Sequence, residues 1–165
     1  LFLGGTVGNF RPSQAISLLS GVCDQLRSGE FLLLGTDLVK DINRIESAYN
    51  DSQGITAEFN LNILRVLNKL LDSDLDTSLF EHRAIYSQEN NRIEMRLRSI
   101  SQQKVCLKKI NLDFEIQEGE EIITEFSTKY NQSRLKKLLE ASGFEMIDWL
   151  TAPEDMFSLS LARKI

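Results

Sequence analysis

The sequence predicts an α/β fold that a smaller α+β segment interrupts, and three observations lead to this prediction. The chain begins with a short apolar run, a helical pattern and a second apolar run that ends at Leu34. It finishes with a helical pattern followed by two more strand-like runs. Between these parts, from about residue 41 to residue 128, two helical patterns are followed by residues of alternating polarity, which indicates strands and hairpins.

The opening elements form one strand–helix–strand unit. Leu1–Leu3 is a continuous apolar run of the buried parallel type, and Gly4–Asn9 is the turn after it. Pro12 begins a helix that Gly29 is expected to end, and Phe31–Leu34 is the next strand. Two strands joined through a helix predict a parallel sheet with a right-handed crossover. The apolar positions of the helix are Ala15, Leu18, Leu19, Val22, Cys23 and Leu26.

Two helices open the middle segment, linked through Asn50–Gly54. The apolar positions of the short first helix are Ile42, Ile45 and Tyr49. The longer second helix is expected to bury a stripe made of Ile63, Val66, Leu67, Leu70 and Leu71.

Strands follow these helices. His82–Ser87 and Arg92–Ser99 are predicted to form a hairpin around the polar turn Gln88–Asn91. Because side chains alternate along a strand, Ile93, Met95 and Leu97 should share one face. Further strands are expected at Lys104–Lys108, Leu112–Ile116 and Glu121–Thr128, so that the middle segment holds an antiparallel sheet.

The end of the chain again shows the pattern of helix and strand seen at its beginning. A helix that carries Leu135, Leu138 and Leu139 ends at Gly143, and the strand Phe144–Thr151 follows it. Ala152–Asp155 then turns the chain. The closing strand alternates apolar residues with serines and is predicted to run antiparallel: Phe157, Ser158, Leu159, Ser160 and Leu161.

Composition narrows the class of protein. A chain of 165 residues with 42% hydrophobic and 26% charged residues can bury a sizeable core. The net charge of −5 and the scattered basic residues argue against nucleic acid or an anionic membrane as a partner. Cys23, Cys106 and the lone His82 are far apart in sequence, so no metal site or disulfide framework is expected, and a cytoplasmic location is the default.

The residues alone leave the function open. Ligands of open α/β sheets gather after the strands, which points to Gly4–Asn9 and Gly35–Asp37. The first turn does not fit the GxGxxG pattern, however, and a glycine turn after a strand more often reflects plain turn geometry than a ligand site. Glu125 and Ser127 share one strand face and could hold a polar group together, or they could lie on an exposed strand edge. Other candidates have simple structural interpretations: Met95 as core filler, Tyr49 as a helix-end aromatic, and Asp37, Lys40 and Asp41 as a helix start with local charge pairing.

Taken together, six blocks strongly resemble the histidine-specific, S-adenosylmethionine-dependent methyltransferase family, which forms hercynine in ergothioneine biosynthesis. They occur in order and with compatible spacing along the chain, which makes them far more specific together than singly. The blocks are Leu3–Phe10, Gly35–Asp41, Ala48–Asp51, Thr56–Asn62, Arg92–Met95 and Thr124–Ser127.

The resemblance implies the C-terminal part of a class I (Rossmann-like) methyltransferase sheet with an inserted α+β substrate-binding domain. The implied bounds are 1–40 and 129–165 for the methyltransferase part and 41–128 for the insert. It also implies that the main S-adenosylmethionine-binding loop lies outside these residues. We therefore expect the isolated chain to be inactive and to self-associate through the bare edge of its first strand.

The resemblance also implies site roles. Asn9 and Tyr49 would hold the α-carboxylate of L-histidine, while Met95, Glu125 and Ser127 would surround its imidazole. The residues expected beside S-adenosylmethionine are Gly4, Gly5 and Thr6. No catalytic residue is assigned and no metal is needed, because a neutral α-amino nitrogen can attack the sulfonium methyl directly. Two alternatives remain: methylation of another amino acid or amine, and a non-catalytic remnant that binds a partner.

Overall fold

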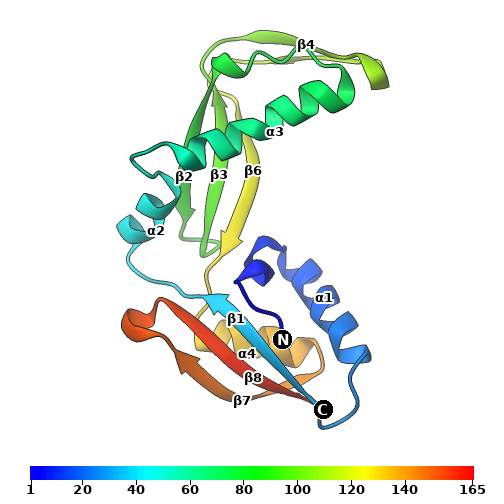
Figure 1. The fold of residues 1–165 in the computed structure, drawn as a ribbon, viewed down its shortest axis with the longest axis vertical. Helices are drawn as coiled ribbons and strands as arrows, with labels where there is room; N and C mark the ends of the chain where they lie inside the picture. The colour runs from blue at the N-terminus through cyan, green and yellow to red at the C-terminus, as the bar shows by residue number, and fades with distance from the viewer. The chain divides into compact units, whose positions relative to one another are not determined.

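The computed structural model describes residues 1–165 and divides into two compact units (Figure 1). Unit 1 consists of Leu1–Asp41, Ser87–Arg92 and Phe126–Ile165. Unit 2 consists of Ile42–Tyr86 and Ile93–Glu125. Unit 1 is thus built from the two ends of the chain and a hairpin tip, and each unit has its own core.

The sheet of unit 1 ends in a reversed strand. β1 (Phe31–Asp37), β8 (Phe157–Lys164) and β7 (Phe144–Thr151) lie in the order β1-β8-β7, and β8 is antiparallel to both neighbours. On the other side of β1, Phe2 forms a parallel bridge with Leu34. Its amide donates to the Leu33 carbonyl and its carbonyl accepts from the Gly35 amide, both at 2.9 Å. The predicted antiparallel finish of the sheet is confirmed. The predicted parallel direction at the start is also confirmed, but Phe2 forms only a single bridge, and Leu1 and Leu3 are 89% and 50% exposed, so the prediction of a buried strand there is wrong.

Two helices cover one face of this sheet, α1 (Pro12–Asp24) and α4 (Gln132–Ala141). The core of unit 1 contains five large side chains that are completely buried, namely Leu19, Leu34, Leu135, Leu139 and Phe144. Along β8, Ser158 and Ser160 are fully buried while Phe157 is half exposed, so the small polar residues of that strand face inward.

Two element ends differ from the sequence prediction. α1 ends at Asp24, well before Gly29. The amides of Gln25 and Leu26 donate to the carbonyls of Val22 and Cys23, three residues earlier, so the last turn has 3-10 hydrogen bonds instead of continuing the α-helix. β1 continues past Leu34 to Asp37, because its residues there stay paired with β8. Between the Leu1–Leu3 segment and α1, Thr6–Asn9 forms the short 3-10 helix η1.

Unit 2 contains both sheet and helix. Its helices are α2 (Ile42–Tyr49), α3 (Ile55–Leu71) and the 3-10 turns η2 (Thr77–Leu79) and η3 (Lys108–Ile110). β2 (Phe80–Ser87), β3 (Arg92–Ser99) and β6 (Glu121–Thr128) form a sheet in the order β2-β3-β6; the ends of β2, β3 and β6 extend into unit 1. The predicted hairpin is confirmed, and Ile93, Met95 and Leu97 are all buried.

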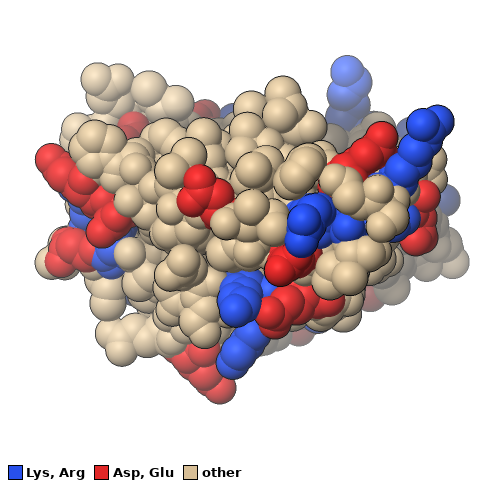
Figure 2. Space-filling view, turned by 90° about the horizontal axis from the view of Figure 1, so that it is seen from below, with Lys and Arg blue, Asp and Glu red and all other residues tan.

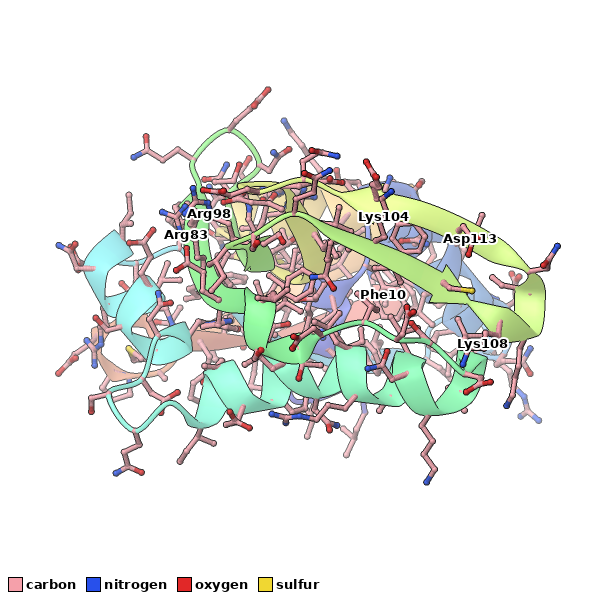
Figure 3. The ribbon with its side chains drawn as sticks, turned by 90° about the horizontal axis from the view of Figure 1, so that it is seen from above. Phe10, Arg83, Arg98, Lys104, Lys108 and Asp113 are labelled. Carbon is pink, nitrogen blue, oxygen red and sulfur yellow. The ribbon has the colours of Figure 1, made fainter.

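A two-stranded ribbon completes unit 2. β4 (Gln103–Leu107) pairs antiparallel with β5 (Leu112–Ile116), and the register sets Lys104 opposite Glu115. Their charged atoms are 3.5 Å apart, an exposed cross-strand pair of modest value. Figure 3 labels Lys104 on β4, Lys108 in the turn η3 between the strands and Asp113 on β5.

The buried stripe of α3 differs from the predicted one. Ile63, Val66 and Leu70 are 42%, 43% and 59% exposed. The residues that pack on the core of unit 2 are Leu61, Leu64, Leu67 and Leu71. Because α3 carries apolar residues on two adjoining faces, helical spacing alone could not decide which face is buried.

Charge is spread rather than concentrated on the surface drawn in Figure 2. Basic and acidic side chains lie among one another on that face, without a broad basic area. No helix is long and apolar enough to cross a lipid bilayer.

Candidate functional site

The two strand-end turns of unit 1 meet at one cavity. Gly4 and Gly5 have φ angles of +87° and +71°, a left-handed conformation that glycine adopts without strain. A Cβ on Gly5 would lie 3.8 Å from the amide nitrogen of Asp37, so the first turn passes close to the end of β1. A cavity of about 430 Å³ opens here, lined by Leu3, Gly4, Gly5, Gly35, Thr36, Asp37, Phe157 and Leu159. Ligands are expected at such carboxyl strand ends.

Gly8 brings η1 against the end of β6. A Cβ on Gly8 would lie 2.8 Å from the carbonyl oxygen of Thr128 and 3.3 Å from Oγ of Ser127, which is closer than ordinary contact. Only a residue without a side chain allows this approach. Asn9, next to Gly8, is exposed, and Ser127 is 8% exposed. Two of the predicted substrate residues therefore come from neighbouring segments of unit 1.

A buried lysine supports Ser127. Lys129 is 1% exposed, and its Nζ donates to Oδ2 of Asp37 at 2.6 Å and to Oγ of Ser127 at 3.1 Å. The other carboxylate oxygen of Asp37 accepts from Lys40, which also donates to the Met156 carbonyl. Asp37 therefore joins two ammonium groups at the end of β1. The predicted charge pairing of Asp37 with Lys40 is confirmed, but the helix after them begins at Ile42.

The two lysines favour the ionised form of the Asp37 carboxyl group. Its partial burial alone would raise the pKa of the carboxyl group. Hydrogen bonds and charges from Lys129 and Lys40 outweigh that effect and hold the pKa below its ordinary value. The carboxylate is thus present at neutral pH and compensates the buried charge of Lys129.

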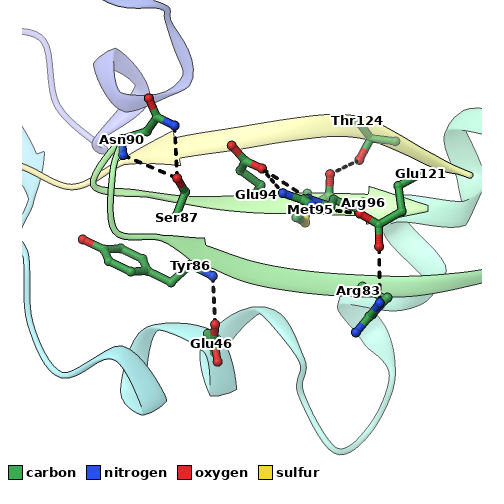
Figure 4. Close-up of polar contacts among 10 residues, drawn as sticks. All are labelled: Glu46, Arg83, Tyr86, Ser87, Asn90, Glu94, Met95, Arg96, Glu121 and Thr124. Carbon is green, nitrogen blue, oxygen red and sulfur yellow. Dashed lines mark hydrogen bonds and ion pairs between the residues drawn. The ribbon is translucent and has the colours of Figure 1, made fainter. Parts of the chain in front are cut away.

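Met95 and Glu125 line a second cavity, of about 210 Å³, within unit 2. Its other lining residues are Phe59, Asn60, Asn62, Ile63 and Thr124. Met95 is 4% exposed, and Thr124 donates its hydroxyl hydrogen to the Met95 carbonyl at 3.0 Å or to the Asn60 side chain (Figure 4). A carboxylate, an aromatic ring and a thioether around one small cavity suit a polar ring with an apolar face.

His82 holds Tyr49 through its backbone. The Asn60 amide donates to Nδ1 of His82 at 2.9 Å, so Nε2 carries the hydrogen and donates to the Tyr49 carbonyl at 2.8 Å. Asn50 adds two hydrogen bonds to the backbone of Ala84 on β2. The lone histidine is therefore a structural link that fixes the end of α2, where Tyr49 lies half-buried.

Another set of charges, on β2, β3 and β6, is structural. Arg96 pairs with Glu94 at 2.6 Å and with Glu121, and Arg83 also reaches Glu121 (Figure 4). The hydrogen bonds that Arg96 donates to Glu94 and, second in size, to Glu121 raise the pKa of its guanidinium group. Because every charge in this row has an opposite partner, the row stabilises strand pairing and leaves no free group for chemistry.

The structure thus assigns the sequence-predicted residues to two groups. Unit 1 contains Gly4, Gly5, Thr6, Asn9 and Ser127. Unit 2 contains Tyr49, Met95 and Glu125. Sequence reasoning missed Asn60, Thr124 and Lys129. A polar residue in the apolar pattern of α3 could have revealed Asn60, but Lys129 resembles any surface lysine in the sequence.

A mixed α/β sheet that ends in a reversed strand, with a glycine turn after a parallel strand, is the architecture of class I methyltransferases. The sequence profile described as histidine-specific methyltransferase, SAM-dependent, matches residues 1–164. The chain belongs to this family.

Two mycobacterial relatives agree with that assignment. The chain is 42% identical over 162 residues to the histidine N-alpha-methyltransferase of Mycolicibacterium smegmatis, covering 98% of the chain and 50% of the relative. It is 41% identical over 164 residues to the protein of the same name from Mycobacterium tuberculosis, covering 99% and 51%. A solved S-adenosylmethionine-dependent methyltransferase from Clostridium acetobutylicum aligns with a TM-score of 0.47 at 10% identity, over 98% of this chain and 56% of that one. The chain spans about half the length of the two mycobacterial relatives.

Proposed function

We propose that the protein to which this chain belongs transfers methyl groups from S-adenosylmethionine to the α-amino nitrogen of L-histidine, up to the trimethylated product hercynine. The observation that carries the proposal is the family match over residues 1–164. The 42% identity to a histidine N-alpha-methyltransferase supports the same substrate.

The strand-end cavity fits part of such a cofactor. Gly4 and Gly5 present backbone without side chains beside a space of about 430 Å³. Phe157 and Leu159 add apolar surface, while Thr36 and Asp37 add polar groups. When bound, S-adenosylmethionine supplies an electrophilic methyl group on a sulfonium. The residues of this chain that would lie beside it are Gly4, Gly5 and Thr6.

The chemistry requires little from protein side chains beyond position. The lone pair of a neutral amine forms the new carbon–nitrogen bond as the carbon–sulfur bond breaks, and the electron pair of that bond stays on sulfur. The first two transfers release a proton from nitrogen, and the third leaves a quaternary ammonium. The protein contributes by holding the nitrogen and the methyl in line and by excluding water.

We assign the substrate contacts residue by residue. Asn9 and Tyr49 would bind the α-carboxylate. Glu125 would accept a hydrogen bond from an imidazole N–H, Ser127 would contact the same ring, and Met95 would pack against it. The cavity that Met95 shares with Glu125 supports the assignments of these two residues. The contact of η1 with Ser127 supports the roles of Asn9 and Ser127.

The proposal is tested by incubating the full-length protein with L-histidine and S-adenosylmethionine and identifying products by mass spectrometry. We expect mono-, di- and trimethylated histidine in turn. A panel of other amino acids and amines is run beside it. Preference for another substrate would overturn the histidine assignment, and absence of transfer to all of them would favour the non-catalytic alternative.

Asn9→Ala and Tyr49→Phe should each weaken the binding of every α-amino acid substrate to the same extent, because both residues are assigned to the α-carboxylate that all these substrates share. Loss of a hydrogen bond to a charged group costs about 1.5–3 kcal/mol, or roughly a 10- to 150-fold rise in Kd. Calorimetric titration of the full-length variants with histidine and with a second accepted amino acid measures this. Asn90→Ala, on the exposed hairpin turn, is the control. An effect confined to histidine would mean that these residues contact the side chain.

A further inference from the structure

Lys129 is a buried ammonium group that lies two residues after Ser127 and contacts its hydroxyl. Its side chain is 1% exposed, and its Nζ lies 3.1 Å from Oγ of Ser127. The Ser127 residue is itself 8% exposed, so water has little access to this hydrogen bond. The second partner of Nζ is Asp37, at 2.6 Å.

The direction of this hydrogen bond is determined by the chemistry of the two groups. A lysine ammonium carries three donors and no acceptor, whereas a serine hydroxyl carries one donor and two acceptor lone pairs. Ser127 therefore accepts from Lys129, and its own hydrogen must be directed to a different acceptor. An ordinary serine could act as donor or acceptor toward a ligand, but the ammonium biases Ser127 toward donating.

We propose that Lys129 is a positioning residue that makes the Ser127 hydroxyl a hydrogen-bond donor to the unprotonated ring nitrogen of the substrate. The inference rests on the proposed function, since it takes Ser127 to contact the substrate ring. A neutral imidazole has one N–H donor and one acceptor nitrogen. With Glu125 able only to accept and Ser127 set to donate, the residues match an aromatic ring that carries one group of each kind.

Lys40 provides a matched control within the same cluster. It pairs with the same carboxylate as Lys129, through the other oxygen of Asp37, and it also donates to the Met156 carbonyl. No hydrogen bond joins Lys40 to Ser127. A purely structural role of the cluster predicts similar effects of Lys40 and Lys129, whereas a role through Ser127 predicts a change in ring preference for Lys129 alone.

The test uses the full-length protein and measures Kd by calorimetry for L-histidine and for 3-(2-thienyl)-L-alanine, whose five-membered aromatic ring contains no nitrogen. In Lys129→Met the preference for histidine should fall roughly 2- to 12-fold, the value of one hydrogen bond. Affinity for the thienyl compound should change less than twofold. Lys40→Met should leave the preference unchanged, and Lys129→Met should have no further effect on it in a Ser127→Ala background.

A second measurement does not depend on the folding of the Lys129 variant. The wild-type protein should bind 3-(pyrazol-1-yl)-L-alanine, whose ring offers an acceptor nitrogen but no N–H, more tightly than the thienyl compound, and Ser127→Ala should abolish that difference. Equal binding of the two rings by wild type would overturn the inference. So would an equal shift of ring preference in Lys40→Met and Lys129→Met. If wild type does not bind histidine at all, the proposed function fails as well, which separates the two outcomes.

Discussion

Replacing Glu125 with alanine in the full-length protein is expected to lower the specificity constant for histidine roughly 10- to 150-fold. The imidazole N–H would lose its charge-assisted hydrogen bond to the carboxylate, and such a bond is worth about 1.5–3 kcal/mol. An amino acid with an apolar ring should be affected far less. The measurement is the ratio of kcat/KM for histidine and for tryptophan in wild type and variant.

The control for this experiment is Glu118→Ala, an exposed residue before the turn at Gly119. It should change both specificity constants by less than about 0.5 kcal/mol, as surface substitutions generally do. If Glu125→Ala behaves like this control, with small and equal effects on histidine and tryptophan, Glu125 is only a solvated strand residue. The cavity that it lines with Met95 would then serve another purpose.

Asp37→Ala is expected to cost about 3–5 kcal/mol of the free energy of unfolding, because it leaves the buried ammonium of Lys129 without its compensating carboxylate. The Asp37 side chain is 33% exposed, so the loss should lie near the lower end of that range. Chemical denaturation of the full-length protein measures it. Glu58→Ala, which removes the exposed partner of Arg65, is the control and should cost less than about 1 kcal/mol.

The contribution of Asp37 should also depend on pH. Its pKa is lower in the folded protein than in the unfolded chain, where a value of about 4 is ordinary. The stabilisation is therefore fully present above pH of about 4 and is lost as the pH falls through the lowered folded value. The stability difference between wild type and Asp37→Ala should shrink over that acidic interval. A difference that is constant down to pH of about 2 would mean that the carboxylate does not act through its charge.

Local sequence signals were strong enough to predict the order and type of the elements. Strand-like alternation around Ile93, Met95 and Leu97 predicted a shared buried face, and the leucine spacing at Leu135, Leu138 and Leu139 predicted α4. These signals depend on the geometry of a single helix or strand, which any few consecutive residues express. The family resemblance rested in the same way on short blocks of consecutive residues.

Element ends and buried faces were predicted less well. Gly29 was expected to end α1, but the helix stops at Asp24, where backbone turns already satisfy the amides. α3 buries Leu64 rather than Ile63, Val66 and Leu70. Both outcomes depend on which other element packs against the helix, and a window of sequence does not contain that partner.

The sequence by itself determined the fold class, the family and the residue types available for binding, because these are written in patterns of neighbouring residues. Only the tertiary structure decided that Gly8 contacts the end of β6 and that Lys129 is buried against Asp37, 92 residues away. The physical reason is that a buried charge is stable only where an opposite charge in contact with it compensates it, and here that carboxylate comes from a residue far away in the sequence. A lysine of this kind is indistinguishable in the sequence from a solvated one, and it becomes a candidate functional residue only when the chain has brought its partners together.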